Sequence, residues 1–406
     1  MSDSAPLAGI RVLDLSRVLA GPWVGQTLAD LGADVIKVER PGSGDDTRAW
    51  GPPFFESPEG DSRSAYFLAA NRGKRSICVN LAHPEGQALV RRLAAGVDIL
   101  VENYKAGDMD KRGLGYAELS EENPGLIYCS ITGFGQTGPL RDKPGYDFMI
   151  QGMAGLMSIT GERPSTGGAS DGGPQKVGVA LADVLTGLYS TIAILAALNE
   201  RQGSGRGQAI DMSLLDVQVA ALANQATNYL VSGVAPGRLG NAHPNIVPYQ
   251  TFATADGHVI VAVGNDAQFV RFCEAIGKPD LASDPRFADN ASRVANRTTL
   301  VPLFEEPLAS RGSAEWLAVF ESNGVPAGPI NRIDEVFAEP QVAARGLQRE
   351  IDGVPGVANP IRYSRSELVY ERPPPALGGQ TREVLEATLG LDDAEIARLV
   401  DAGVIA

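Results

Sequence analysis

Cysteine, histidine and positive charge are all scarce in this chain of 406 residues. The three cysteines and three histidines form no CxxC pair and no cluster, so we expect buried free thiols and no metal site. The formal net charge is −14, from 35 basic and 49 acidic residues. This balance argues against a nucleic-acid partner, which would require a basic face. To bind a phosphorylated ligand, such an acidic protein would need basic residues gathered at the binding site.

Targeting and membrane segments are also missing. The first residues, Met1-Ser-Asp-Ser-Ala-Pro6, have neither the basic nor the apolar part of a signal peptide. The longest apolar run, residues 184–198, contains Gly, Thr, Tyr and Ser and is short for a membrane span. We therefore expect a cytoplasmic protein with no membrane partner.

Two common catalytic fingerprints are absent or misplaced. The first predicted strand is followed by Leu15-Ser-Arg-Val-Leu-Ala-Gly-Pro22, not by the GxGxxG of nicotinamide and flavin sites. Gly168-Ala-Ser-Asp-Gly172 matches GxSxG, but no apolar strand precedes it. The hydrolase motif requires a sharp strand-to-helix turn, so we interpret this segment as a loop and reject a hydrolase.

Apolar runs and helical patterns alternate along the first 140 residues. This alternation predicts an α/β fold with a Rossmann-like, doubly wound parallel sheet. The predicted strands span residues 10–15, 35–38, 76–80, 98–101 and 126–131, with a later strand at 209–212. From residue 225 the pattern changes to a hairpin, 247–253 and 258–263, followed by helices. We predict a large domain (1–224), a smaller α+β domain (225–330) and a C-terminal part (331–406) that returns to the large domain.

Asp183 stands alone in an apolar helix, because no other charged residue occurs between Lys176 and Glu200. A desolvated carboxylate is costly unless it is hydrogen-bonded, paired or used in chemistry. Taken by itself, this segment favours a structural acid slightly over a catalytic one. Other parts of the chain reverse that preference.

Basic residues gather near the predicted strand ends of the first domain. They are Arg17, Arg40, Arg72, Lys74, Arg75, Lys111 and Arg112. Ligands of open α/β sheets bind beyond the carboxyl ends of the strands, where such residues could hold phosphates. Scattered surface charge is the alternative interpretation, and the residues alone leave it open.

Several separated motifs resemble the family III CoA-transferases of the CaiB/BaiF type. They are Val12-Leu-Asp-Leu-Ser-Arg-Val-Leu-Ala-Gly-Pro22, Leu31-Gly-Ala-Asp-Val-Ile-Lys-Val-Glu-Arg-Pro-Gly-Ser-Gly-Asp45, Asn71-Arg-Gly-Lys-Arg-Ser-Ile77, Val101-Glu-Asn-Tyr104, Gly133-Phe-Gly-Gln-Thr-Gly-Pro139, Gly145-Tyr-Asp147, Gly205-Arg-Gly-Gln208, Gly324-Val-Pro-Ala-Gly-Pro-Ile330, Val336-Phe-Ala-Glu-Pro-Gln341 and Arg372-Pro-Pro-Pro375. The resemblance therefore covers nearly the whole chain.

The resemblance implies a catalytic role for Asp183 and a set of contacts with coenzyme A. The implied CoA contacts are Arg17, Val18, Ala20, Arg40, Arg72, Lys74, Asn103, Tyr104 and Lys111. It further implies that CoA is a co-substrate, that no cofactor is bound permanently, and that two chains form an interlocked homodimer.

Tyr146 favours transfer over the related racemisation reaction. The 2-methylacyl-CoA racemases carry Gly-His-Asp where this chain has Gly145-Tyr-Asp147. Racemisation needs two groups that titrate near neutral pH, and a tyrosine pKa of about 10 is far from the histidine value of about 6.5. A non-catalytic CoA-binding protein is a further alternative, against which the intact Asp183 motif argues.

Residues 238–250 indicate the kind of acid that receives CoA. They resemble the succinyl-CoA:dicarboxylate group, including the succinyl-CoA:glutarate enzymes, and lack the glycine run of members acting on oxalate and formate. By this resemblance His243 and Tyr146 would line the acyl pocket, and Arg48 would bind the distal carboxylate.

The expected reaction runs through a covalent aspartyl-CoA thioester on Asp183. With an ordinary pKa this carboxylate is ionised at pH 7 and needs no base. Both the anhydride and the thioester hydrolyse, so water must be excluded. We expect the glycine-containing loops 161–173 and 240–245 to act as lids and to supply N–H donors to the oxyanion.

Overall fold

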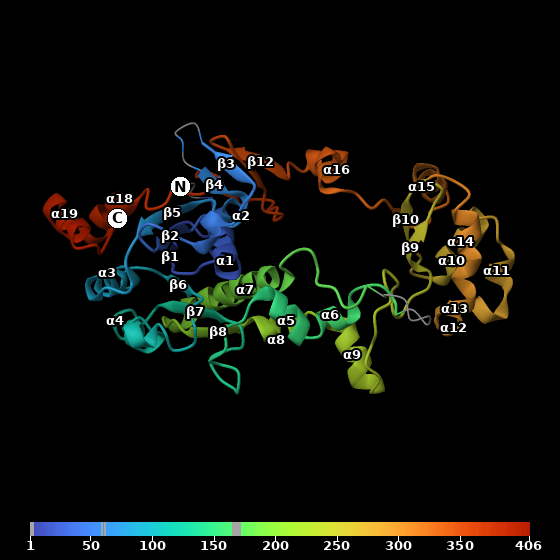
Figure 1. Cartoon of the computed structure of the whole chain (residues 1–406), viewed down its shortest axis with the longest axis horizontal. Coiled ribbons are helices and arrows are strands. Elements are labelled where there is room, and N and C mark those ends of the chain that lie inside the picture. Colours follow the sequence, from blue (N-terminus) through green and yellow to red (C-terminus); the bar gives the residue numbers. More distant parts are fainter. Residues whose placement is uncertain (1–3, 58–59, 61, 165–171) are drawn as a thin grey trace. The chain divides into compact units, whose positions relative to one another are not determined.

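The computed structural model describes residues 4–57, 60, 62–164 and 172–406, and it divides into two compact units (Figure 1). Unit 1 comprises Met1–Leu156, Val177–Val231 and Gln341–Ala406, and unit 2 comprises Met157–Lys176 and Ser232–Pro340. Residues 168–171 of the GxSxG segment, and residues 165–171 of the predicted 161–173 loop, lie outside the described residues.

The predicted domain ranges differ from these units at both junctions. Residues 157–176 belong to unit 2, whereas the predicted large domain (1–224) includes them. Backbone hydrogen bonds give the reason. Gln175 N donates to Thr160 O (3.0 Å), and Gly240 N donates to Gly161 O (3.1 Å), so this segment is bound to residues of unit 2.

Unit 1 is built on a six-stranded sheet in the order β5-β2-β1-β6-β7-β8, in which every neighbouring pair is parallel. The strands are β1 (Arg11–Asp14), β2 (Asp34–Glu39), β5 (Lys74–Cys78), β6 (Ile99–Glu102), β7 (Ile127–Thr132) and β8 (Ala209–Ser213). Numbered along the chain, this is the 3-2-1-4-5-6 order of dinucleotide-binding folds. The strand order reverses between β1 and β6, which is where such sheets bind ligands.

Helices cover both faces of this sheet, and the predicted doubly wound α/β fold is confirmed (Figure 1). Successive strand residues alternate between two cores, because side chains of a strand point to opposite faces. Val12 packs with α1 (Ala20–Asp30) and α7 (Leu181–Ser204). Leu13 packs in the core formed with α3 (Pro84–Ala94), α18 (Thr381–Leu389) and α19 (Asp393–Asp401).

The smaller elements of unit 1 lie around this framework. They are η1 (Asp46–Ala49), β3 (Phe54–Glu56), β4 (Ser62–Ser64), α2 (Ala65–Leu68), η2 (Asp110–Arg112), α4 (Tyr116–Glu122), α5 (Asp147–Met153), α8 (Leu214–Ala220), α9 (Ala223–Ser232), β12 (Gln348–Ile351) and β13 (Val354–Val357). The short helices α6 (Leu156–Ile159) and α17 (Pro340–Ala344) lie at the junctions with unit 2. The cysteines Cys78, Cys129 and Cys273 are free and buried, as predicted.

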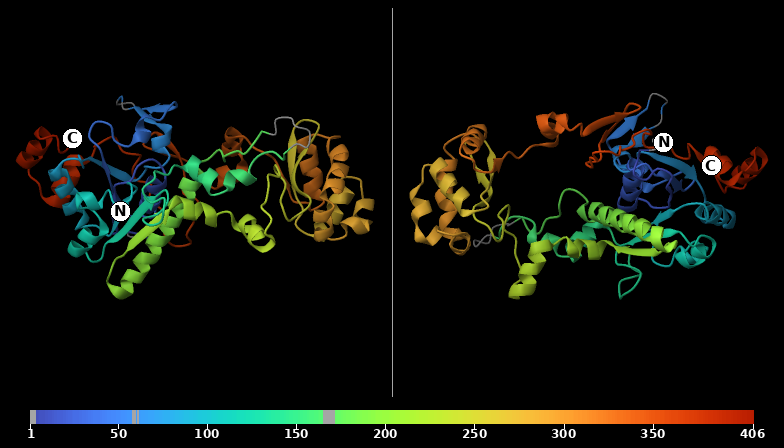
Figure 2. Two further views of the ribbon diagram at one scale, coloured as in Figure 1. Left: turned by 60° about the horizontal axis from the view of Figure 1, so that its bottom comes forward. Right: turned by 180° about the vertical axis from the view of Figure 1, so that it is seen from behind.

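Helix α7, yellow-green in Figure 2, has 24 residues and is long and apolar enough to cross a membrane. The apolar run 184–198 is only part of this helix. The expectation that the run is too short to span a membrane was therefore wrong, because the whole helix is long enough. A single such helix is weak evidence for a membrane span, because core helices pass the same test. Here Ile194, Ala197 and Leu198 of α7 are buried in the core of unit 1.

Unit 2 combines a three-stranded antiparallel sheet, in the order β11-β10-β9, with helices. Its elements are β9 (Tyr249–Ala253), β10 (His258–Ala262), α10 (Asp266–Ala275), α11 (Asp280–Ser283), η3 (Pro285–Phe287), α12 (Asn290–Ala295), α13 (Arg297–Leu300), α14 (Pro302–Leu308), α15 (Ser313–Ser322), β11 (Ala327–Gly328) and α16 (Ile333–Ala338). The predicted hairpin is β9–β10. Phe272, Phe304 and Phe320 fill a separate core, so unit 2 packs around its own apolar centre.

Two glycines shape the region around the start of α1: Gly21 allows the tight turn into α1, and Gly187 allows α7 to lie close to it. A Cβ on Gly21 would lie 2.2 Å from Ser16 Cβ, so only glycine fits this tight turn from β1 into α1. A Cβ on Gly187 would lie 2.9 Å from Ala20 O and 3.0 Å from Trp23 Cβ. The close approach of the two helices sets the position of the first turn of α7.

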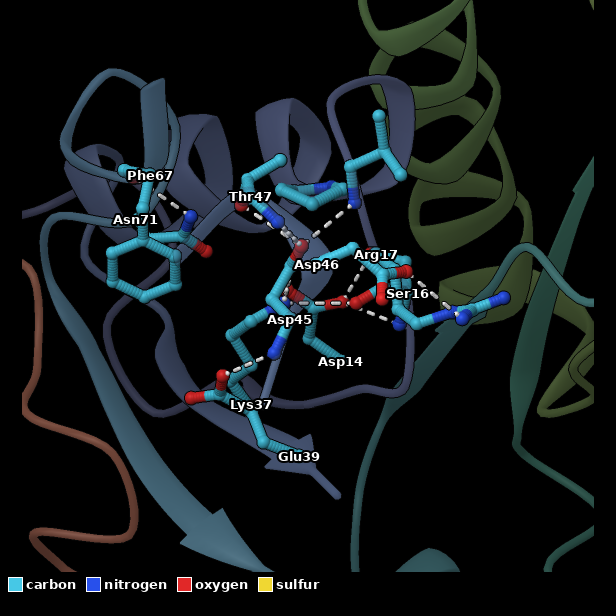
Figure 3. Close-up of polar contacts among 12 residues, drawn as sticks. Asp14, Ser16, Arg17, Lys37, Glu39, Asp45, Asp46, Thr47, Phe67 and Asn71 are labelled. Carbon is cyan, nitrogen blue, oxygen red and sulfur yellow. Dashed lines mark hydrogen bonds and ion pairs between the residues drawn. The ribbon is translucent and has the colours of Figure 1, made fainter. Parts of the chain in front are cut away.

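Two buried ion pairs lie close to the loop that follows β1, and Figure 3 labels Lys37 and Asp45 of the first pair. Lys37 Nζ is 3.0 Å from Asp45 Oδ2, and Lys74 Nζ is 2.9 Å from Asp14 Oδ2, with all four side chains at most 1% exposed. Burial by itself would lower the pKa of Lys37, but the carboxylates of Asp45 and Asp14 outweigh it and raise that pKa. Burial lowers the pKa of Lys74 to about 8, which still leaves it charged at neutral pH.

These pairs also hold the backbone of the loop. Lys37 Nζ donates to Ser16 O (2.8 Å), and Asp45 Oδ1 accepts from Val18 N (3.2 Å) and Thr47 N (3.0 Å). The loops after β1 and β2 are therefore fixed to each other through one buried carboxylate. Removing one partner of such a pair leaves a buried charge without compensation.

We predict that Asp45→Ala lowers the free energy of unfolding by about 3–5 kcal/mol, because Lys37 stays buried without its partner. The matched control is Asp46→Ala at the next position. Asp46 is 41% exposed and pairs with Arg17 and Arg40, so its loss should cost about 0–1 kcal/mol. Urea unfolding followed by fluorescence measures both. Equal losses in the two variants would contradict a dominant role for the buried pair.

Candidate active site

A cavity of about 450 Å³ lies in unit 1 where the strand order reverses. Residues after β1, β6 and β7 line it together with the first turns of α1 and α7. It brings together these sequence-predicted site residues: Arg17, Val18, Ala20, Asn103, Tyr104, Tyr146 and Asp183. Residues far apart in the sequence thus meet at the position expected for the ligand of such a sheet.

Asp183 lies in the first turn of α7, where the neighbouring carboxylate of Asp147 serves as the helix cap. The N-cap residue Ala180 has no side-chain capping bond. Instead, Asp147 Oδ1 accepts from Ala182 N (2.8 Å) and from Asp183 N (3.4 Å), and its Oδ2 accepts from Gln151 Nε2 (2.8 Å). Asp147 therefore satisfies N–H groups that a helix start leaves unpaired.

The ionisation of Asp183 differs from the sequence-based expectation. Burial and the negative charge of Asp147 raise the pKa of Asp183 to about 7. The group is thus partly protonated at neutral pH, and the expectation of full ionisation is corrected. Among the described residues no donor bonds this carboxylate. A desolvated carboxylate without hydrogen bonds is a stronger nucleophile than one solvated by water.

The loop after β1 is held by side chains from neighbouring strands. Arg17 N donates to Asn103 Oδ1 (2.8 Å), and Asn103 Nδ2 donates to Arg17 O (2.7 Å). Val18 has φ +71°, a conformation that is a real outlier for a β-branched residue. Strain of this kind persists only where surrounding bonds impose it, and it gathers at functional sites.

A second cavity, of about 220 Å³, shares Arg17 and Tyr104 with the first and adds Arg40 and Arg112. The side chains of Arg17 and Arg40 are 44% and 64% exposed, and their ion pairs with Asp46 are at 3.2 and 3.9 Å. The guanidinium groups of Arg17 and Arg112 lie 5.4 and 5.7 Å from the centre of the Tyr104 ring. This cluster of accessible guanidinium groups suits a phosphate-bearing ligand.

Three sequence-predicted site residues use their donors inside the protein. Lys74 Nζ donates to Asp14 Oδ2, Pro22 O and Asn71 Oδ1, each at 2.9 Å, which accounts for all its protons. Arg72 binds both oxygens of Asp30 (2.8 and 2.6 Å). Arg48 likewise binds both oxygens of Glu39 (2.8 and 2.7 Å). Internal bonds to protein acceptors thus occupy these three side chains, which argues against their expected roles as ligand contacts.

Two further predicted residues are not among those that line the unit 1 cavities. Lys111 is 74% exposed and pairs with Asp108 (3.1 Å), and neither cavity is lined by it. His243 belongs to unit 2, where its Nδ1 accepts from Asn245 N (3.1 Å) and burial lowers its pKa.

Several residues that line the main cavity were missed by the sequence analysis. They are Trp50, Lys105, Arg141, Lys143 and Asp147. Arg141 and Lys143 lie well beyond the predicted strand 126–131, whereas Lys105 follows the predicted strand 98–101 closely and could have been included by the same argument. Asp147 stands beside Tyr146, so the same Gly-Tyr-Asp motif could have suggested it. Within the described part of the chain, no group of His, Cys, Asp and Glu side chains could hold a metal ion.

Comparisons with known proteins agree over nearly the full length of the chain. The family model of CoA-transferase family III matches residues 7–381. A succinate–glutarate CoA-transferase of Agrobacterium fabrum is 55% identical over 386 residues, which are 94% of this chain and 95% of that protein. A human succinyl-CoA:glutarate CoA-transferase is 45% identical over 412 residues, 100% of this chain and 91% of that protein.

Solved structures agree with this assignment. The crystal structure of a CaiB/BaiF family protein from Brucella suis has a TM-score of 0.85 and 52% sequence identity, and the match covers 95% of this chain and all of that one. The matches span both units, including the stretch that contains Asp183. The chain therefore belongs to CoA-transferase family III.

Proposed function

We propose that this enzyme transfers CoA from succinyl-CoA to glutarate or a similar C5 dicarboxylic acid, with Asp183 as the nucleophile. The observation that carries the proposal is the desolvated Asp183 carboxylate in a cavity where the strand order reverses. The names of the Agrobacterium and human relatives supply the donor and the acceptor.

The proposed reaction breaks one thioester as it forms another. The Asp183 carboxylate attacks the thioester carbonyl, the C–S bond breaks, and an aspartyl–acyl anhydride and the CoA thiolate result. The thiolate then attacks the Asp183 carbonyl, which gives an aspartyl-CoA thioester and releases the first acid. The incoming acid repeats these steps in reverse. Holding the reactants in place can supply about 7–11 kcal/mol of the barrier reduction.

The chain's own groups support this chemistry in two ways. Asp147 fixes the first turn of α7 and so fixes where the Asp183 carboxylate can point. The positive end of the α7 dipole favours negative charge near Asp183 as the oxyanion develops. The loops 161–173 and 240–245 remain candidate lids, and the described part of them is joined by the bond from Gly240 N to Gly161 O (3.1 Å).

We assign the phosphate-bearing part of CoA to Arg17 and Arg40, with the backbone at Val18 and Ala20 beside it. Asn103 acts through the backbone of Arg17, to which it makes two hydrogen bonds. Tyr104 adds a ring surface close to the guanidinium groups of Arg17 and Arg112. Tyr146 lines the same cavity and is 62% exposed. It occupies the position at which a racemase would need a group titrating near neutral pH.

We also propose that the active form is a homodimer. Large apolar side chains of unit 1 are open to solvent in the single chain: Phe148 (58%) and Met153 (53%) on α5, Ile192 (61%) on α7, and Leu230 (78%) and Val231 (82%) on α9. Exposed apolar surface of this kind marks contacts with other molecules. A cytoplasmic location stays part of the proposal, because free cysteines are usual in a reducing compartment.

Asp183→Ala should abolish transfer of CoA from succinyl-CoA to glutarate while leaving CoA affinity unchanged, because only the nucleophile is lost. Chromatography of acyl-CoA products and calorimetry with CoA measure the two properties. Asp216→Ala is the matched control, since Asp216 also lies in the first turn of a unit 1 helix but outside the cavity. Transfer by Asp183→Ala, or absence of glutaryl-CoA from the unaltered enzyme, would overturn the assignment.

The raised pKa of Asp183 predicts the pH profile. A protonated carboxyl is no nucleophile, so kcat/KM should fall about tenfold per unit below pH 7 and level off above it. Asp147→Asn keeps an oxygen to accept from Ala182 N but removes the negative charge that helps to raise the Asp183 pKa. The acidic limb should therefore move to lower pH. An acidic limb at the same pH in both enzymes would show that Asp183 does not govern it.

Replacing Arg17 or Arg40 by glutamine should weaken CoA binding by roughly tenfold or more, because a charge-assisted hydrogen bond contributes about 1.5–3 kcal/mol. Calorimetric titration with CoA measures the change. Arg382→Gln is the control, because Arg382 is 55% exposed and pairs with residues of the C-terminal helices. Unchanged affinity in both cavity variants would remove these residues from the phosphate site.

A further inference from the structure

Glu102 is a buried acid at the carboxyl end of β6, and neither the proposed chemistry nor the phosphate site uses it. It is the last residue of the strand and is only 3% exposed. The strand register places Glu102 opposite Ser130 of β7, and Ser130 opposite Asp211 of β8. The three residues therefore form one row on the same face of the sheet, because paired residues of neighbouring strands point to the same side.

Burial of this carboxyl group is costly, because no cation neutralises it. Within the described chain Glu102 makes no ion pair, although Lys105 lines the same cavity of about 190 Å³. Burial raises the pKa of Glu102 to about 7, and the charges of Asp110 and Asp108 act in the same direction. A well-packed apolar residue would stabilise this strand end at least as well. The presence of an acid here is thus explained by the contacts that it makes.

Glu102 accepts a hydrogen bond from the backbone that follows it. Tyr104 N donates to Glu102 Oε2 (2.7 Å), which closes a turn directly after β6. The Ser130 hydroxyl also stabilises the charged form of Glu102, and Ser130 Oγ accepts from Gln136 Nε2 (2.8 Å). Gln136 N in turn donates to Asp211 Oδ2 (3.0 Å). Side chains from β7 and β8 thus support the carboxyl group that holds the turn.

The turn held by Glu102 contributes to both cavities of the candidate active site. Asn103 exchanges two hydrogen bonds with the backbone of Arg17 (2.8 and 2.7 Å). The Tyr104 ring lies 5.4 Å from the guanidinium group of Arg17 and 5.7 Å from that of Arg112. Both Asn103 and Tyr104 line the cavity of about 450 Å³, and Tyr104 also lines that of about 220 Å³. A shift of this turn would therefore move the Arg17 loop and the ring together.

We propose that Glu102 is a positioning residue for CoA binding, which holds the Tyr104 N–H and so fixes the turn that carries Asn103 and Tyr104. This inference rests on the proposed function, in which Arg17 and Arg40 bind the phosphate-bearing part of CoA. Glu102 itself lines neither of the two cavities, so it acts on the ligand only through the turn.

The test removes the hydrogen-bond acceptor and then restores it. Glu102→Leu cannot accept from Tyr104 N, and its calorimetric affinity for CoA should fall at least about tenfold, equivalent to about 1.4 kcal/mol. Glu102→Gln offers an amide oxygen at the same place, and its affinity should stay within about threefold of the unaltered enzyme. Because Glu102 is partly protonated at neutral pH, a neutral side chain of the same shape is a close match.

Kinetics and unfolding separate this role from a general loss of structure. In Glu102→Leu the KM for succinyl-CoA should rise, while kcat at saturation should change little because Asp183 is untouched. Its free energy of unfolding should stay close to that of the unaltered enzyme, since an apolar side chain replaces a buried acid. Glu102→Ala is the second variant, which removes the acceptor together with its volume and should lose the same affinity for CoA.

Asp98→Ala is the matched control, because Asp98 precedes the same strand at its opposite end. Its carboxylate accepts from Arg11 N and from Arg201 Nη2, each at 2.9 Å, so this variant also loses two hydrogen bonds. An equal fall in CoA affinity in Asp98→Ala would overturn the proposal. So would unchanged affinity in Glu102→Leu and Glu102→Ala, or no recovery in Glu102→Gln.

Failure of the proposed function gives a different result. If the unaltered enzyme binds CoA but makes no glutaryl-CoA, the proposed transfer is wrong, and calorimetry of the Glu102 variants still decides the positioning role. Absence of CoA binding to the unaltered enzyme would contradict both.

Discussion

The buried pair of Lys37 and Asp45 is the constraint on which the candidate active site depends. Two ions held at most 1% exposed contribute little net stability compared with apolar residues of the same size. The main effect of this ion pair is to fix the position of the backbone in the loop after β1. The ammonium group of Lys37 holds the carbonyl of Ser16, and the carboxylate of Asp45 holds the N–H of Val18. The loop that carries Arg17 thus has its backbone fixed from below while its guanidinium group stays accessible.

A second constraint joins the two carboxylates at the start of α7. Asp147 caps the helix and, by its charge, also raises the pKa of Asp183. The position and the ionisation of Asp183 are therefore coupled. Asp147 holds the helix turn that carries Asp183, and its charge also keeps Asp183 partly protonated at neutral pH. The helix dipole opposes this effect by favouring the charged form. The pKa of Asp183 therefore depends on any ligand that changes the charge or the water content of the cavity.

Much of the fold follows from the sequence because local patterns determine it. The alternation of apolar runs and helical patterns predicts the parallel sheet. The isolated charge of Asp183 indicates a structural or catalytic acid at the start of α7. The roles of Arg48, Arg72 and Lys74 could not be read in this way. Their partners Glu39, Asp30 and Asp14 lie on other segments, and only the folded sheet brings them together. The sequence around a basic residue near a strand end is the same whether its side chain binds a phosphate or a buried aspartate, so the sequence does not distinguish the two roles.

The left-handed backbone of Val18 has a consequence for the life of the protein in the cell. An unfolded chain does not maintain this conformation, because the bond to Asp45 that imposes it exists only after β1 and β2 have paired. A ligand that contacts this loop therefore binds the native state alone. By mass action such a ligand shifts the folding equilibrium towards the native state, so fewer molecules are unfolded and open to proteolysis. The abundance of the enzyme would then follow the concentration of its own substrate.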